Sequence, residues 1–161
     1  MDKTNALRIL DKAKIPYTLH TYESDGIALD AIEVSHRIHE SIDKVYKTLI
    51  GVGASKRYIV LVINGADEVD LKKAALFLNE KNLELIPVLS LLSVSGYVRG
   101  GCSPVGMKKQ FTTVFDEKIL NLDRVIVSAG RIGLQMELES KTLIACVDGK
   151  VADLVKTKAF I

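Results

Sequence analysis

The sequence contains little of what would place it in several large classes of protein. Of its 161 residues only Cys102 and Cys146 are cysteines, and they match neither a disulfide framework nor a metal-binding pattern. No apolar run is long enough to span a bilayer, and the amphipathic start of the chain has no apolar signal core. Linkers, repeats and low-complexity segments are absent as well. We therefore expect a cytoplasmic protein in a reducing compartment, with no membrane segment, metal or cofactor.

The remaining composition is typical of one globular domain. The chain has 48% hydrophobic and 26% charged residues, and its formal net charge is +2. A chain of this length can bury roughly two thirds of the surface that its unfolded form exposes. We therefore predict one domain over residues 1–161. A net charge this small does not by itself indicate a nucleic-acid-binding protein.

Hydrophobic periodicity predicts more strands than helices. Helices are expected near residues 4–14, near residues 28–38 and after Asp70, which is a suitable N-cap. The predicted strands cover residues 17–22, 45–52, 58–63, 83–86, 112–115, 124–127 and 134–138. Residues 143–147 fit either the end of a helix or the start of a hairpin. Because several strands are apolar on both faces and strict βαβ alternation is missing, we predict an α+β fold, a curved sheet or barrel with helices packed outside it.

Lys47 is the only charged residue in the apolar run of residues 45–52. Because side chains alternate along a strand, it shares a face with Val45 and Leu49. An ammonium group among such neighbours loses water unless an anion or a polar ligand meets it, so Lys47 is a candidate binding residue. The alternative is a lysine near a strand end whose stem reaches to solvent. The strand pattern alone does not separate these two interpretations.

A long interval of the chain lacks acidic residues. None of the 20 aspartates and glutamates lies between Glu84 and Asp116, whereas Arg99, Lys108 and Lys109 lie there among several glycines. Glycine lets a backbone approach a ligand closely and direct its N–H groups toward it. We therefore predict a loop that receives an anion or a carbonyl group. It is not a nucleotide P-loop, because the lysine and the hydroxyl residue of that motif are missing after its second glycine.

Three segments resemble, in this order and spacing, the YbaK/EbsC family of free-standing editing enzymes: residues 46–49 (Tyr-Lys-Thr-Leu), 96–109 and 127–134. This family is best known for Cys-tRNA(Pro) deacylases, and it is related to ProX and to the editing domain of prolyl-tRNA synthetases. The similarity extends over nearly the whole chain, to about residue 154. It implies a mixed, mostly antiparallel β-barrel-like sheet surrounded by helices, and a mischarged tRNA as the substrate.

The resemblance also implies a set of site residues. The essential lysine of the family corresponds to Lys47, and the backbone N–H groups of Gly101 and Cys102 are candidates for stabilising the ester carbonyl. The implied substrate-binding residues are Tyr22, Thr48, Gly100, Ser103, Pro104, Ser128, Ala129 and Gly130. Candidate phosphate contacts are Arg99, Lys108, Lys109 and Arg131, although an ordinary solvated pair is the alternative for the two lysines. The chain departs from the family at residues 27–29, which contain no aromatic where a pocket phenylalanine is expected.

No Ser-His-Asp or Cys-His arrangement is visible, so we predict no protein nucleophile and interpret Cys102 as a small packing residue. In the family a cysteinyl substrate can attack with its own thiol, and a positioned water is the other option. We predict a deacylase for Cys-tRNA(Pro) and also for Cys-tRNA(Cys). The alternatives are a deacylase for another small amino acid, such as Ala-tRNA(Pro), and a non-catalytic module that binds a nucleotide or an RNA end. A chain this small lacks an obvious surface for reading an anticodon, so prolyl-tRNA synthetase is the expected partner.

Overall fold

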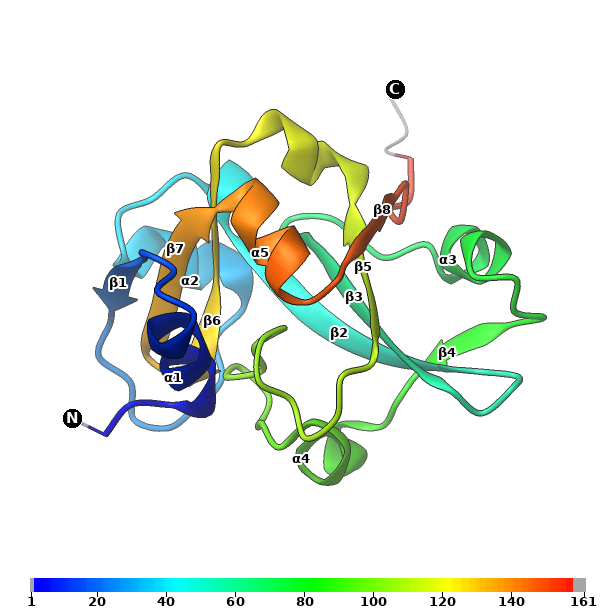
Figure 1. Ribbon diagram of the computed structural model, residues 1–161, viewed down its shortest axis with the longest axis horizontal. Helices are drawn as coiled ribbons and strands as arrows, with labels where there is room; N and C mark the ends of the chain where they lie inside the picture. The colour runs from blue at the N-terminus through cyan, green and yellow to red at the C-terminus, as the bar shows by residue number, and fades with distance from the viewer. Residues whose placement is uncertain (1, 158–161) are drawn as a thin grey trace.

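The strands of the computed structural model, which describes residues 2–157, form two sheets (Figure 1). The three-stranded sheet has the order β1 (Thr18–Thr21), β7 (Leu134–Glu139), β6 (Arg124–Arg131). The five-stranded sheet has the order β4 (Leu83–Leu85), β2 (Tyr46–Gly53), β3 (Tyr58–Asn64), β5 (Thr112–Asp116), β8 (Lys150–Ala152). The β3–β5 and β5–β8 pairs are parallel, and the other four pairs are antiparallel. The predicted mixed and mostly antiparallel pairing is therefore confirmed.

The two sheets meet at one end of β2, but they do not close into a barrel. Within residues 2–157, a single parallel bridge from Val45 to Ile126 connects them. Farther along, β4 pairs with the open edge of β2 only at residues 51–53. The α+β class with mixed sheets and surrounding helices is confirmed, and of the two predicted forms, a curved sheet or a barrel, the closed barrel is not formed by the described strands. Apolar strand faces predict which surfaces are buried, but not which edges pair.

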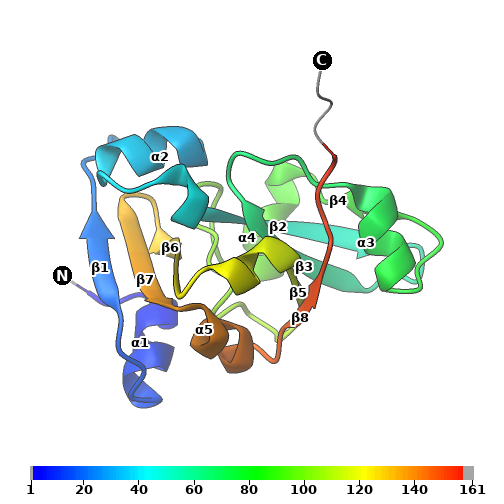
Figure 2. The same cartoon turned by 90° about the horizontal axis from the view of Figure 1, so that it is seen from above.

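Helices surround both sheets (Figure 2). The described α-helices are α1 (Asn5–Lys12), α2 (Ala31–Arg37), α3 (Leu71–Phe77), α4 (Val88–Ser95) and α5 (Ser140–Cys146), with 3₁₀ turns η1 (Ile42–Lys44) and η2 (Glu117–Asn121). In Figure 2, α1 and α2 lie beside the three-stranded sheet, and α3 lies beside the five-stranded sheet. No helix within residues 2–157 combines the length and the apolarity that a membrane span requires.

Helix α2 begins three residues later than its periodicity predicts. The Asp30 side chain accepts a hydrogen bond from the Glu33 N–H at 2.8 Å, so Asp30 is the N-cap and the helix starts at Ala31. Residues 28–30 are consequently not helical. The backbone of Asp30 is extended, and all three residues line the pocket described below.

Strand β3 is the centre of the hydrophobic core. Val60 and Val62 contribute to the largest cluster of buried side chains, whereas Ile59, Leu61 and Ile63 contribute to a second cluster beneath α3. Both faces of the strand are therefore covered, and this explains why its sequence is apolar without interruption. The antiparallel hairpin of β2 and β3, which was predicted from the glycine-containing connection, is confirmed.

The sequence patterns did not predict α4. Its apolar residues are distributed around the helix rather than along one stripe, and Leu89 is 96% exposed. Pro87 before the helix and Gly96 after it, with a left-handed φ of 88°, are signals that could have identified both ends. After Ser140 the helical interpretation is correct, because α5 occupies this region and β8 pairs in parallel with β5 instead of forming a hairpin. Residues 158–161 of the tail lie outside the described residues.

Candidate functional site

A pocket of about 370 Å³ lies along the edge of β2 that has no strand neighbour. The pocket lies between β4, which pairs with β2 at residues 51–53, and β6, which is bridged to Val45 just before β2. The part of the β2 edge between these two contacts is unpaired. Its lining comes from the start of α2 (Ala28, Leu29, Asp30, Ala31, Val34), from β2 and the residue before it (Val45, Tyr46, Lys47, Thr48, Leu49), from Gly65, from the loop after α4 (Arg99, Gly100, Cys102), and from β6 and β7 (Ser128, Gln135). The structure therefore brings together five segments that are far apart in the sequence.

Lys47 projects into this pocket from β2. It is half-buried, and its Nζ donates a hydrogen bond to the Gly65 carbonyl oxygen at 3.3 Å. Burial lowers the pKa of Lys47, and the nearby carboxylates of Asp67, Glu68 and Asp30 oppose this effect. A desolvated ammonium group with one long hydrogen bond is well suited to bind an oxygen atom of a ligand.

The loop after α4 lies close to two other segments. Gly100 has a φ of +84°, and a Cβ at this position would lie 2.8 Å from the Ala28 Cβ. A Cβ on Gly101 would lie 3.0 Å from the backbone at Arg131 and Ile132. Both glycines are thus required by close packing, since any larger residue would displace the loop from the pocket.

The backbone N–H groups of this loop differ in their availability. The Gly101 N–H donates to the Val98 carbonyl oxygen at 2.9 Å, so it is already used in a turn. The Cys102 N–H has no protein acceptor among residues 2–157. Of the two donors predicted for an oxyanion, only the one at Cys102 is free in this structure.

The Cys102 side chain lines the pocket, yet it has the properties of a packing residue. It is 8% exposed, and burial raises the pKa of its thiol to about 11 against a smaller opposing effect of hydrogen bonding to Ser95. The thiol is therefore protonated near neutral pH, and the reactive species of a cysteine is the thiolate. This agrees with the interpretation that Cys102 is not a nucleophile.

Thr48, Gly100 and Ser128 are the predicted substrate-binding residues that line the pocket. The Thr48 Oγ1 is buried and has no hydrogen-bond partner among the described residues. The Ser128 Oγ accepts a hydrogen bond from the Gly130 N–H at 3.2 Å, which leaves its own proton available. Both hydroxyl groups can therefore bind a ligand.

The other predicted substrate-binding residues do not line the pocket: Tyr22, Ser103, Pro104, Ala129 and Gly130. Tyr22 packs against the cluster beneath α2, where its hydroxyl is buried without a partner. Ser103 is fully buried, and its Oγ accepts the Val105 N–H at 3.2 Å. Pro104 lines a separate hollow of about 200 Å³. Ala129 and Gly130 pack near Thr4, and they support the turn rather than the pocket wall.

The four predicted phosphate contacts do not form one patch. Arg99 lines the pocket, whereas Lys109 lines the separate hollow beside Pro104. The aliphatic stem of Lys108 lies over Gly96, and the Arg131 guanidinium donates to the Asp2 carbonyl oxygen at 3.4 Å. Arg99 is thus the one of these cations that the structure places in the pocket lining.

Sequence patterns missed Gln135, Asp30 and Gly65 in the lining. On β7, Gln135 and Glu137 alternate with Leu134 and Met136, a pattern that is typical of a strand with one solvated face. The structure instead buries Gln135, which is 5% exposed. Three polar residues that alternate with apolar ones, Gln135, Glu137 and Glu139, were the signal that could have identified this face.

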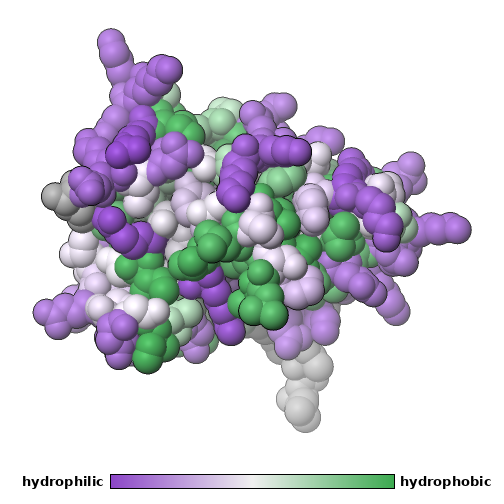
Figure 3. Space-filling view, turned by 90° about the horizontal axis from the view of Figure 1, so that it is seen from below, coloured by the Kyte–Doolittle hydropathy of each residue, from purple (hydrophilic) through white to green (hydrophobic). Residues whose placement is uncertain are grey.

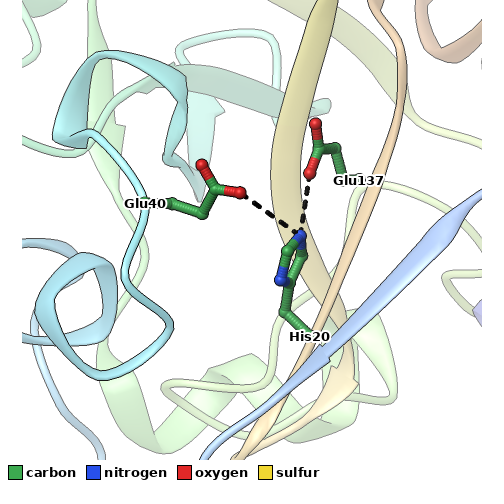
Figure 4. Close-up of side chains that lie close together, drawn as sticks. All are labelled: His20, Glu40 and Glu137. Atoms are coloured by element: carbon green, nitrogen blue, oxygen red, sulfur yellow. Dashed lines mark hydrogen bonds and ion pairs between the residues drawn. The ribbon is translucent and has the colours of Figure 1, made fainter.

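A second group of polar side chains lies on the same face of the three-stranded sheet (Figure 4). His20 Nε2 lies 2.8 Å from an oxygen of Glu137 and 3.9 Å from an oxygen of Glu40. Lys44 Nζ and Arg124 Nε also bind Glu137, at 2.8 and 3.2 Å. Burial alone would raise the pKa of Glu137, but its hydrogen bonds with these three neighbours lower it to about 2. Two cations already balance the carboxylates, so we interpret the group as an ion-pair network that joins η1 to β1, β6 and β7.

The fold and the pocket define an α+β domain that places a desolvated lysine and a free backbone donor beside a gap between two sheets. The family model described as the aminoacyl-tRNA editing domain matches residues 28–146. The chain is also 37% identical over 152 residues to EbsC of Enterococcus faecalis, provisionally named a Cys-tRNA(Pro)/Cys-tRNA(Cys) deacylase, and the match covers 94% of this chain and 93% of EbsC. The chain therefore belongs to the aminoacyl-tRNA editing domain family, which confirms the resemblance found in the sequence.

Solved structures show the same fold at low sequence identity. A candidate trans-editing enzyme for prolyl-tRNA synthetase superposes with a TM-score of 0.82 at 20% identity, covering 98% of this chain and all of the other. A hypothetical protein of known structure superposes with a TM-score of 0.86 at 18% identity, covering 95% of this chain and all of the other. The arrangement of two open sheets is thus a property of the fold.

Proposed function

We propose that this protein is a free-standing editing enzyme that deacylates mischarged aminoacyl-tRNA, with Cys-tRNA(Pro) as its main substrate and Cys-tRNA(Cys) as a second one. The observation that carries the proposal is the pocket itself, whose lining includes Lys47, with one long hydrogen bond to Gly65, and Cys102, whose backbone N–H has no protein acceptor among residues 2–157. Family membership and the name of the 37% identical EbsC support this choice of substrate.

In the proposed reaction, the ester that joins the amino acid to the terminal ribose lies in the pocket. The Cys102 N–H donates to the carbonyl oxygen as negative charge develops on it, an interaction whose loss typically reduces the rate about 10²–10³-fold. Lys47 binds a ribose hydroxyl or the terminal phosphate and holds the ester in position. Arg99, on the exposed rim, is available for the phosphate that precedes the terminal nucleotide.

We propose that the substrate provides the nucleophile. The cysteinyl sulfur attacks its own ester carbonyl, the carbon–oxygen bond to the ribose breaks, and the thiol proton is transferred to the leaving ribose oxygen. The products are a cyclic thioester and an uncharged tRNA. The high pKa of Cys102 supports this assignment, because the protein has no competing thiolate in the pocket.

The deciding experiment uses purified protein with tRNA that carries a labelled amino acid. Cys-tRNA(Pro), Cys-tRNA(Cys), Ala-tRNA(Pro), Ser-tRNA(Ser) and Pro-tRNA(Pro) are incubated separately, and loss of the ester is measured. We expect rapid loss of cysteine and slow or no loss of the others. Equal cleavage of the seryl and cysteinyl esters would instead indicate that water attacks. Binding without loss of any ester would indicate a non-catalytic module.

We further propose that prolyl-tRNA synthetase provides the discrimination between tRNAs, and that it contacts α4. This helix exposes Val88, Leu89 and Leu92 at 58%, 96% and 54%, and apolar side chains gather on the face of the molecule where α4 lies (Figure 3). Three residues separate the end of α4 from Arg99 at the pocket rim, so a protein bound there would adjoin the acceptor end of a bound tRNA. The name of the structural neighbour, a trans-editing enzyme for prolyl-tRNA synthetase, supports this partner.

We also propose that the editing domain includes the segment before the family match. The side chains of Ala6, Leu7 and Leu10 on α1 are buried in the main cluster, and β1 pairs with β7. Residues 5–21 thus complete the three-stranded sheet that carries Gln135 and Ser128. An enzyme of translation whose two cysteines, Cys102 and Cys146, are free thiols is expected to act in the cytoplasm.

A further inference from the structure

Gln135 is a residue of the pocket wall whose side-chain amide has no protein partner within residues 2–157. It is 5% exposed, it lines the pocket, and its side chain has no hydrogen bond to any residue within 2–157. In the sheet register its neighbours are Ser128 on β6 and His20 on β1. The amide atoms of Gln135 are not among the side-chain atoms that are both buried and unpaired, so they are open to the pocket rather than sealed in the core. A polar group that lines a pocket without a protein partner is available to bind a ligand.

A second unsatisfied atom lines the same pocket from the other sheet. The Thr48 Oγ1 on β2 is buried and has no partner. Thr48 and Gln135 therefore border one space from two different sheets. Both groups are uncharged, and both contain an oxygen that can accept a hydrogen bond.

The hydrogen-bonding groups in the pocket divide by type. Lys47, Arg99 and the Cys102 N–H can only donate, so they match the carbonyl, hydroxyl and phosphate oxygens of an aminoacyl ester. The same ester carries an α-ammonium group, which can only donate and therefore needs an acceptor. Asp30 is one acceptor in the lining, but it is exposed at the rim and its Oδ1 already accepts the Glu33 N–H. Two side-chain acceptors in the lining have no protein partner among residues 2–157: Thr48 Oγ1, which is buried, and Gln135 Oε1.

We infer that Gln135 Oε1, assisted by Thr48 Oγ1, accepts the hydrogen bonds of the substrate α-ammonium group. This inference rests on the proposed function. It makes Gln135 a specificity residue that selects aminoacyl-tRNA with a free α-amino group. An N-acylated ester, such as a peptidyl-tRNA or a formylated initiator tRNA, has only one N–H at this nitrogen and carries an added acyl group that would press against β7. We therefore expect the pocket to exclude such esters.

The test compares two substrates that differ only in the amino group. One is cysteinyl-tRNA(Pro), and the other is 3-mercaptopropionyl-tRNA(Pro), which keeps the ester, the thiol and the spacing between them. Wild-type protein is expected to prefer the cysteinyl ester about 10- to 100-fold in kcat/KM, since one hydrogen bond to a charged group has this effect. Gln135→Met keeps the length of the side chain but has no strong acceptor. It should reduce kcat/KM for the cysteinyl ester by the same factor and leave the deamino ester within about threefold.

Two further variants serve as controls. Gln135→Glu retains an acceptor, so it should keep the preference for the cysteinyl ester. Gln110→Met changes an exposed glutamine outside the pocket lining, whose Nε2 donates to the Val147 carbonyl oxygen, and it should leave both rates unchanged. Thermal unfolding of each variant verifies the fold.

Three outcomes would overturn the inference. Wild-type protein that cleaves both esters equally would show that the amino group is not recognised. A preference that survives Gln135→Met but disappears in Asp30→Asn would assign the acceptor to the rim carboxylate. Failure to cleave any of the esters would refute the proposed function, and the role of Gln135 with it, whereas cleavage without dependence on the amino group refutes the role of Gln135 alone.

Discussion

Replacement of Lys47 by methionine should separate activity from stability. Methionine keeps most of the apolar stem and removes the ammonium group that donates to Gly65 at 3.3 Å. If Lys47 positions the ester, its loss should reduce kcat/KM for Cys-tRNA(Pro) about 10²–10³-fold, or about 2.7–4 kcal/mol of transition-state stabilisation. Lys47→Arg should not restore full activity, because a planar guanidinium group cannot replace a compact ammonium group in a half-buried site.

The same substitution, Lys47→Met, should raise the free energy of unfolding slightly or leave it almost unchanged. The lost hydrogen bond is long and contributes at most about 0.5–1.5 kcal/mol, while the variant no longer has to desolvate an ammonium group. The pKa of Lys47 is lower in the folded protein than its usual value of 10.5, so the unfolded chain binds this proton more tightly. The free energy of unfolding of the wild type should therefore increase as the pH rises from the folded pKa of Lys47 toward 10.5. Lys47→Met should not show this increase.

Two measurements test this reasoning together. Deacylation is followed with labelled Cys-tRNA(Pro), and urea unfolding is measured between neutral pH and pH 10 for wild type, Lys47→Met and Lys47→Arg. The expected result is a large loss of kcat/KM with a change in unfolding free energy of less than about 1 kcal/mol. A variant that retains activity within threefold, or that loses activity only because it unfolds, would refute the assigned role of Lys47.

Three more predictions follow from other parts of the molecule. Cys102→Ala should keep most deacylase activity, because its thiol has a pKa of about 11; a folded but inactive variant would make Cys102 the nucleophile. Glu137, whose pKa falls from 4.5 to about 2 on folding, should stabilise the protein fully above about pH 4.5 and lose this effect as the pH decreases toward 2. Urea unfolding of Glu137→Gln should thus depend less on pH in that range than wild type, with the exposed Glu139→Gln as the control, and an unchanged dependence would contradict the ion-pair assignment. Leu89→Ser should leave intrinsic deacylation intact and abolish the preference for tRNA(Pro) that prolyl-tRNA synthetase provides, whereas Leu120→Ser, also on the surface, should keep this preference; an equal preference in both variants would exclude α4 as the contact.

The sequence determined the local elements wherever one physical signal dominated. Strands β2 and β3 were predictable because a glycine-containing connection separates two apolar runs, and α3 was predictable because Asp70 accepts the N–H groups of Lys72 and Lys73. Lys47 was recognisable as a candidate binding residue because a single charge interrupts an apolar strand. Helix α4 was not predicted, because its apolar residues lie all around the helix and do not form the one-sided stripe by which an amphipathic helix is recognised.

Only the tertiary structure decided which of the candidate residues form a site. The pocket exists because β4 and β6 leave part of the β2 edge unpaired, and edge pairing depends on contacts between residues about thirty to eighty positions apart. Local patterns also cannot tell that the Gly101 N–H is used in a turn while the Cys102 N–H is free. The alternation of side chains along β7 predicts that Gln135 and Met136 lie on opposite faces of the strand. Both residues are buried, because other segments of the chain pack against each face. The sequence of a strand determines which side chains share a face. Whether its polar face becomes a pocket wall depends on segments from elsewhere in the chain that pack beside it.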